Sequence, residues 1–193
     1  VNGKKPSHPE WRKILVNHTF PEALQGLLKL SRNLYWCWNS EATELFRQID
    51  PEGWELLDHN PIALLESFTF TRLQELEKDA AFMARLAEVM KNFEAYMALA
   101  SEKKKPSIAY FSMEFGLHES VQIYSGGLGV LAGDYLKEAS DSNVDMCGIG
   151  LLYRYGYFKQ VLSPHGEQVP QYFPQRFNHL PLKPVRNAEG EWV

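Results

Sequence analysis

The sequence predicts an α/β protein in which a helical N-terminal region precedes the start of a parallel β-sheet. Apolar residues recur at helical spacing through almost all of residues 1–100. After Pro106, a strand-length apolar run, a glycine-rich loop, an amphipathic helix and a second apolar run follow in that order. We therefore expect a helical region over residues 1–104 and the beginning of an α/β domain over residues 105–193. One pair of parallel strands does not make a complete sheet, so the second region is expected to be truncated.

Proline, serine and asparagine divide the first region into helices. The expected helices cover residues 21–35, 41–49, 61–65 and 79–101. Ser40 is expected to cap the second of them, because its hydroxyl can accept from the first unpaired N–H groups. Trp36 and Trp38, between the first two helices, could stack against a sugar, but packing in a helical core is the favoured interpretation.

The second region has the pattern of a β-α-β unit, which joins parallel strands. Residues 107–115 and 144–153 are the expected strands. The helix between them is expected to face inward with Leu128, Leu131, Ala132, Tyr135, Leu136 and Ala139. Asn143 suits the left-handed position after that helix. The remainder of the chain is expected to be an irregular connection around Gly156 and Gly166.

A glycine loop, Gly126-Gly127-Leu128-Gly129, stands immediately before this helix. Glycines let a ligand approach the main chain, and a helix N-terminus offers unpaired N–H groups that favour an anion. The spacing is neither G-x-G-x-x-G nor a phosphate-binding loop that ends in Gly-Lys-Ser/Thr, so a dinucleotide or ATP site is not supported. The pattern alone leaves two alternatives open, an anion site and a tight turn for strand–helix packing.

Composition narrows the class of protein. The net charge of −4 gives no reason to expect nucleic acid as a partner. The six histidines never fall at the spacing of metal ligands, so no metal site is expected. Cys37 and Cys147 have no C-x-x-C spacing, which favours a reducing compartment, and the cytoplasm is the expected location. No run of about 20 apolar residues predicts a membrane span.

Three ordered blocks resemble the N-terminal domain of the alpha-glucan (glycogen/starch) phosphorylases. They are residues 108–115, 124–134 and 150–160, with sequences IAYFSMEF, YSGGLGVLAGD and GLLYRYGYFKQ. Residues 10–98 resemble the helical leader of the shorter bacterial and archaeal branch of that family. The resemblance implies the start of a Rossmann-like domain of a GT-B glycosyltransferase.

The resemblance also implies a reaction and its participants. Inorganic phosphate attacks the terminal glucose of an α-1,4-glucan and releases glucose 1-phosphate, reversibly. Pyridoxal phosphate is bound to a lysine of the C-terminal domain, which this sequence does not contain. The expected partners are therefore the glucan, phosphate, glucose 1-phosphate and the remainder of the phosphorylase chain, with a homo-oligomer as a further possibility. On its own the chain is expected to be inactive.

Candidate site residues follow from the same resemblance. The loop residues that would line the cleft against the glucosyl and phosphate groups are Gly126, Gly127, Leu128 and Gly129. Glu114 ends the first strand and could face the cleft or cap the backbone. Arg154 could line the cleft or form a structural ion pair.

Two positions depart from the family pattern. Ser125 stands where animal-type enzymes have Asn, so a side-chain contact to the sugar is expected to differ. Glu167 stands where many relatives have Trp, which puts a role for that loop in doubt. The alternative to an enzyme part is a stand-alone carbohydrate- or phosphate-binding module without catalysis.

Overall fold

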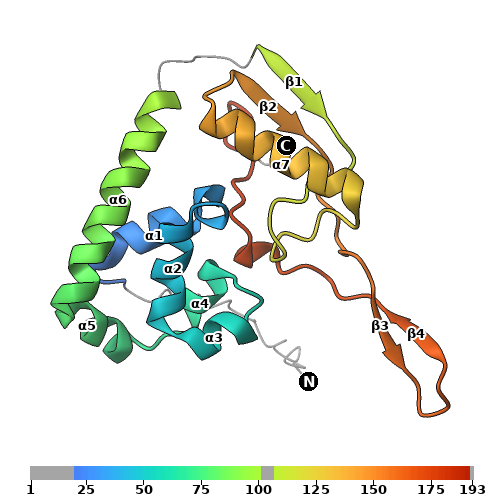
Figure 1. The fold of residues 1–193 in the computed structure, drawn as a ribbon, viewed down its shortest axis with the longest axis horizontal. Coiled ribbons are helices and arrows are strands. Elements are labelled where there is room, and N and C mark those ends of the chain that lie inside the picture. Colours follow the sequence, from blue (N-terminus) through green and yellow to red (C-terminus); the bar gives the residue numbers. More distant parts are fainter. Residues whose placement is uncertain (1–19, 101–106, 192–193) are drawn as a thin grey trace, which may run out of the picture.

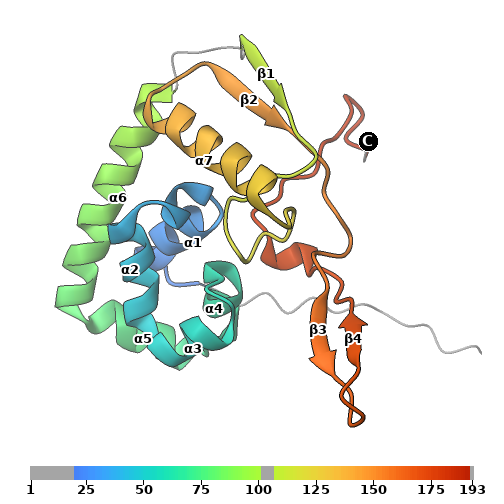
Figure 2. The same ribbon diagram turned by 45° about the vertical axis from the view of Figure 1, so that its right-hand side comes forward.

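The structure, a computed structural model, describes residues 20–100 and 107–191. A helical region and an α/β region lie side by side, and α7 lies between the two-stranded sheet and the helices (Figures 1 and 2). The helical elements are η1 (Glu22–Leu24), α1 (Gln25–Ser31), η2 (Leu34–Cys37), α2 (Ser40–Ile49), α3 (Pro51–Leu56), α4 (Pro61–Ser67), α5 (Phe70–Lys78) and α6 (Ala80–Ala100). The predicted boundary at residues 104/105 lies outside the described residues. Residues 10–19 of the expected leader lie outside them as well.

Asparagine side chains decide where several helices begin. The predicted cap at Ser40 is wrong by one residue, because Asn39 has the extended backbone and its Oδ1 accepts from Ala42 N at 2.9 Å. The predicted helix over residues 21–35 is interrupted, because Asn33 Oδ1 accepts from Tyr35 N at 2.9 Å and starts the separate 3-10 turn η2. Short polar side chains thus divide an apolar stripe that looks continuous in the sequence.

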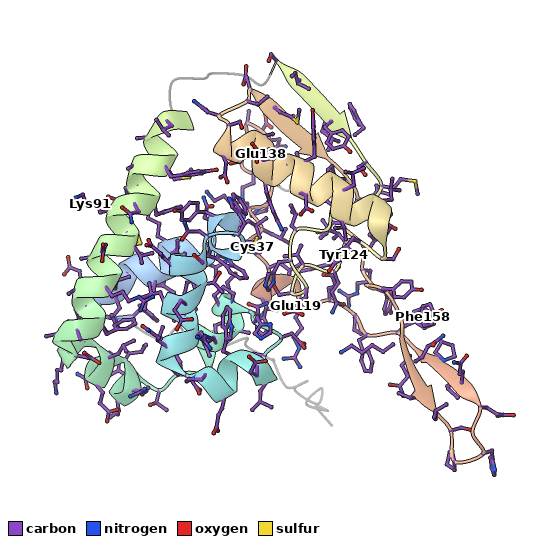
Figure 3. The ribbon with its side chains drawn as sticks, viewed as in Figure 1. Cys37, Lys91, Glu119, Tyr124, Glu138 and Phe158 are labelled. Carbon is purple, nitrogen blue, oxygen red and sulfur yellow. The ribbon has the colours of Figure 1, made fainter. Side chains whose placement is uncertain are left out.

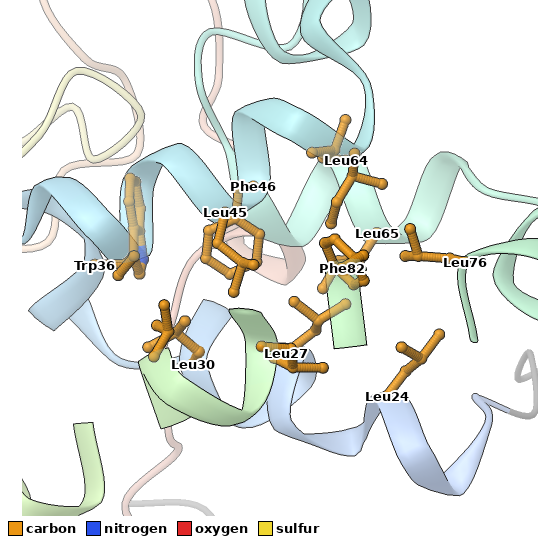
Figure 4. Close-up of a cluster of buried hydrophobic side chains, with 14 of the residues drawn as sticks. Leu24, Leu27, Leu30, Trp36, Leu45, Phe46, Leu64, Leu65, Leu76 and Phe82 are labelled. Atoms are coloured by element: carbon orange, nitrogen blue, oxygen red, sulfur yellow. The ribbon is translucent and has the colours of Figure 1, made fainter. Parts of the chain in front are cut away.

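The core of the protein lies in the helical region (Figure 4). Trp36 is 2% exposed and meets Phe46 and Trp54 edge-on, with ring centroids 6.3 and 6.0 Å away. This burial confirms the core interpretation of Trp36 and leaves no ring face for a sugar. Trp38 is only half-buried, and its Nε1 donates to Asp141 Oδ1 on α7 at 3.0 Å.

The α/β region contains the predicted β-α-β unit. Its elements are β1 (Ile108–Phe111), α7 (Gly127–Asp141), β2 (Met146–Ile149), β3 (Lys159–Leu162), β4 (Gln168–Gln171) and η3 (Phe177–His179). β1 pairs with β2 in parallel, with Ile108 opposite Met146, which confirms the predicted strand direction. Asn143 has a φ of 50°, as predicted for the position that follows the helix.

The predicted inward face of α7 is partly wrong. Ala132 and Ala139 are buried, but Leu128, Leu131 and Tyr135 are 67%, 68% and 53% exposed. The described sheet has two strands, so only a narrow strip of the helix lies over it. Tyr135 still meets the ring of Tyr110 on β1 edge-on, with centroids 5.5 Å apart, but more than half of the surface of each of the three side chains stays exposed.

The expected irregular connection after the second strand is also wrong in part. β3 and β4 form an antiparallel hairpin in which Val161 lies opposite Val169, and the hairpin extends away from the body (Figure 2). Gly166, with a φ of 80°, lies in its turn, a conformation that favours glycine. Within the described ranges, no helix has both the length and the apolarity needed to cross a bilayer.

Candidate functional site

The glycine loop begins α7 at the edge of the sheet where β1 ends (Figure 1). Gly126 is the N-cap of the helix, and no side chain caps it. The first N–H groups of α7 therefore have no partner within the helix. A cavity of about 340 Å³ lies nearby, at the carboxyl ends of the two strands, and is lined by Phe111, Ser112, Met113, Ile149, Gly150 and Leu151. This is the edge at which parallel sheets bind ligands.

The Glu114 carboxylate holds the loop through hydrogen bonds from Ser125. Ser125 Oγ donates to Glu114 Oε1 at 2.7 Å, and Ser125 N donates to Glu114 Oε2 at 3.3 Å. The Ser125 hydroxyl, followed by the backbone N–H groups of Ser125, Gly126 and Gly129, lowers the pKa of the Glu114 carboxyl. Glu114 is itself fixed, because its N–H and its carbonyl both hydrogen bond to Ser112 Oγ, at 3.3 and 2.7 Å. A carboxylate therefore already occupies part of this anion-binding turn.

The three glycines of the loop differ: Gly126 and Gly127 are open, whereas Gly129 is packed. A Cβ on Gly126 or Gly127 would meet nothing within 4 Å. A Cβ on Gly129 would lie 2.5 Å from Tyr124 Cβ and 3.0 Å from Glu114 Oε2, so this position has room only for glycine. Gly133, one turn later, packs against the backbone of Gly116 in the same way. The two alternatives for the loop thus apply to different residues. Gly129 serves close packing, whereas Gly126 and Gly127 have the open backbone that an anion site needs.

The donors left for a ligand are the backbone N–H groups of Gly127 and Leu128. Within the described chain no hydrogen bond occupies them, whereas Gly126 and Gly129 donate toward Glu114. The side chain of Leu128 is 67% exposed, so an apolar surface accompanies these donors. Two unpaired donors at the positive end of a helix can bind a phosphate oxygen or another anion.

Arg154 lies apart from this group. Its guanidinium lies over the ring of Phe177, 5.6 Å from the centroid, and its carbonyl accepts from Gln175 N at 2.9 Å. The neighbouring Tyr153 reaches the strand edge, where its hydroxyl donates to Met113 O at 2.9 Å. A place for Arg154 in the cleft therefore stays a prediction.

Sequence reasoning did not predict the packing of Gly116 on α7. Gly116 N donates to Gly129 O at 2.6 Å, which ties this segment to the first turn of α7. The available signal was the four-residue spacing of Gly129 and Gly133, which places both on one helix face. In the described parts of the chain, no group of three or more His, Cys, Asp or Glu residues could hold a metal ion.

Curated relatives resemble the chain along most of its length. A maltodextrin phosphorylase of Thermococcus litoralis is 40% identical over 186 residues, which cover 91% of this chain and 22% of the relative. A glycogen phosphorylase of Mycobacterium tuberculosis is 40% identical over 194 residues, or 94% of this chain and 22% of the relative. For a glycogen phosphorylase of Aquifex aeolicus the values are 41% over 174 residues, 88% and 25%. The chain thus spans about a quarter or less of the length of these relatives.

No solved structure matches the chain significantly. A family model with the description "Protein of unknown function (DUF3417)" matches residues 20–121, which run from the first described helix through β1 to the segment after Gly116. This match covers more than half of the chain. The chain therefore belongs to the family described as Protein of unknown function (DUF3417), and it is related at about 40% identity to glycogen and maltodextrin phosphorylases.

Proposed function

We propose that this chain supplies one wall of the substrate cleft of an α-glucan phosphorylase. The reaction is the reversible phosphorolysis of an α-1,4-glucan by inorganic phosphate, which releases glucose 1-phosphate. The observation that carries the proposal is the start of α7, where no described residue hydrogen bonds to the N–H groups of Gly127 and Leu128, beside an open surface. The names of relatives that are about 40% identical supply the substrate class.

The residues of this chain would act by binding and orienting an anion. The N–H groups of Gly127 and Leu128 would donate to an oxygen of the phosphate or of the glucosyl group, with the partial positive charge of the helix start behind them. Glu114 would orient these donors, because it accepts from the residues on either side of them. No proton transfer is required of these groups.

Pyridoxal phosphate belongs to the proposal as a group held outside this chain. Among the described residues, no lysine hydrogen bonds to Glu114 or to the glycine loop. Lys137, the lysine of α7, is directed to Asp134 at 3.9 Å instead. The residues present therefore do not fit a cofactor lysine, and the covalent attachment would come from the rest of the protein.

Three further parts of the proposal concern the whole protein. We propose a GT-B arrangement, in which the sheet begun by β1 and β2 continues in the rest of a Rossmann-like domain. The exposed apolar side of α7, with Leu128, Leu131 and Tyr135, supports such a continuation.

A cytoplasmic location is supported by the free thiols of Cys37 and Cys147. A homo-oligomer stays a proposal.

The direct test is an assay of the full-length protein with maltooligosaccharide and phosphate. The proposal expects glucose 1-phosphate, released in proportion to glucan shortening. A separate titration of residues 20–193 with glucose 1-phosphate and with maltooligosaccharide tests the alternative, a stand-alone binding module. Tight binding by this part, with no phosphorolysis by the full-length protein, would favour the module and overturn the enzyme.

A further inference from the structure

Side chains of the helical region hydrogen bond directly to the C-terminal end of α7. Asp141 Oδ1 accepts from Trp38 Nε1 at 3.0 Å and from Tyr96 Oη at 2.8 Å. Tyr96 Oη also lies 2.6 Å from Ser140 Oγ. The last turn of α7 is therefore joined by a shared carboxylate to α6 and to Trp38, the residue after η2. This contact fixes one end of the helix whose other end is the glycine loop.

The N-terminal end of α7 is reached indirectly, through residues 116–121, here called the bridging segment. Cys37 Sγ donates to Leu117 O at 3.5 Å, and the rings of Trp36 and His118 meet edge-on with centroids 4.5 Å apart. Figure 3 marks Cys37 and Glu119, which belong to the two sides of this contact. The bridging segment thus lies against the buried aromatic core of the helical region.

An ionic contact closes the same interface. The His59 ring lies between two carboxylates, with its Nε2 3.0 Å from Glu55 Oε2 and its Nδ1 in contact with Glu119 Oε1. Glu55 comes from α3, whereas Glu119 comes from the bridging segment. His59 has a φ of 54°, and the left-handed backbone after α3 turns its ring toward the bridging segment.

The backbone of the bridging segment then contacts the backbone of the glycine loop directly. Gly116 N donates to Gly129 O at 2.6 Å, and a Cβ on Gly116 would lie 3.0 Å from the Gly129 carbonyl and from Val130 Cα. On the next turn, Gly133 packs directly on the Gly116 backbone. No flexible side chain separates the two backbones. A displacement of the bridging segment must therefore move the first turn of α7.

We propose that the helical region positions the glycine loop through the bridging segment, with Glu119 and His59 as positioning residues. The match of the family model agrees with this pairing, since it covers the helical region and the bridging segment and ends at residue 121, before the loop. The ligand of the loop rests on the proposed function, but the mechanical coupling does not. The helical region is thereby assigned a role in the site, although none of its described side chains hydrogen bonds to the loop.

The test uses hydrogen exchange in the full-length protein. Replacing Glu119→Gln removes the ionic contact without leaving a cavity, because the Glu119 side chain is 55% exposed. We expect amide exchange to rise about two- to fivefold in residues 116–121 and also in residues 126–133, as for loss of a partly exposed ion pair. The double variant Glu119→Gln/His59→Gln should add little to either single variant. The matched control is Glu94→Gln, which removes the exposed ion pair between Lys29 and Glu94 and should leave residues 126–133 unchanged.

Catalysis gives a second readout. The KM for phosphate should rise by a similar factor in Glu119→Gln, while kcat changes less, and Glu119→Asp should restore part of the effect. Increased exchange confined to residues 116–121, with residues 126–133 and KM as in the wild type, would overturn the coupling. A wild-type protein without phosphorolysis whose variant still shows increased exchange in residues 126–133 would refute the proposed function alone.

Discussion

The Ser125 hydroxyl donates to the Glu114 carboxylate at 2.7 Å and so joins the residue before the glycine loop to the segment after β1, which ends at Phe111 and not at Glu114 as predicted. Ser125 Oγ is the largest cause of the lowered pKa of Glu114. In Ser125→Ala we expect this pKa to move up toward its ordinary value and the KM for phosphate to increase about two- to tenfold. Carboxyl 13C shifts followed against pH check the pKa, and Ser125→Thr, which keeps a hydroxyl, is the matched control.

The direction in which pH changes the stability of the loop follows from the lowered pKa of Glu114. Because the folded pKa is below the ordinary value, the contribution of Glu114 to loop stability is present above the ordinary pKa. It is lost as the pH falls through the lowered folded pKa. If Ser125→Ala leaves both the pKa of Glu114 and the KM unchanged, the hydroxyl has no part in holding the loop.

Gly133 and Gly126 should differ in their tolerance of the same substitution. A Cβ on Gly133 would collide with the backbone of Gly116, whereas a Cβ on Gly126 meets nothing within 4 Å. We expect Gly133→Ala to destabilise the protein by about 1–3 kcal/mol or more, and Gly126→Ala to change stability little. Thermal unfolding of the two full-length variants makes the comparison. Equal midpoints would contradict the close packing of α7 on the bridging segment.

His118 makes the interface between the helical region and the bridging segment sensitive to acid. Burial lowers the pKa of His118 to about 4, while Glu119 opposes this effect and His59 and Lys137 add to it. Since the folded pKa lies below the ordinary value, the contribution of neutral His118 is present above about pH 6.5 and is lost as the pH falls toward 4.

His59 acts in the opposite direction. The hydrogen bond with Glu119 raises the pKa of His59, so its contribution is present below its ordinary pKa and is lost as the pH rises through the raised folded value. Protection of residues 116–121 from exchange, relative to the intrinsic rate at each pH, should therefore decrease as the pH falls from 6.5 toward 4 and as it rises through the raised pKa of His59, and His118→Gln should remove only the acidic decrease. If His118→Gln loses protection at low pH as the wild type does, the acid sensitivity belongs to other groups.

The sequence predicted the elements whose signals are local. The parallel pairing of β1 and β2 follows from the strand–loop–helix–strand order, and Asn143 marks the end of α7 by its tolerance of a left-handed backbone. The hairpin of β3 and β4 was missed, because Pro and Gln within its strands weaken the β pattern. The helix starts at Asn39 and Asn33 were missed because apolar periodicity says nothing of which side chain caps.

The sequence predicted where the candidate site lies, but not which of its residues are open to a ligand and which are packed. The motif identified the loop, yet nothing in the spacing separates Gly127, which is open, from Gly129, which is packed on Glu114. That difference depends on Glu114 and Tyr124 meeting the loop in three dimensions. The contact of Glu119 with His59, 60 residues apart in the chain, has no local signal either.

The open backbone at Gly127 is the central claim, and Gly127→Val in the full-length protein tests it most directly. Ala87→Val, at an exposed position of α6, introduces the same side chain on a helix away from the loop and is the control. Phosphorolysis of maltooligosaccharide should fall at least about a hundredfold in Gly127→Val, with the unfolding midpoint nearly unchanged, because the new Cβ blocks ligand approach to the N–H groups. Full activity in Gly127→Val would contradict the account and remove the loop from the substrate site.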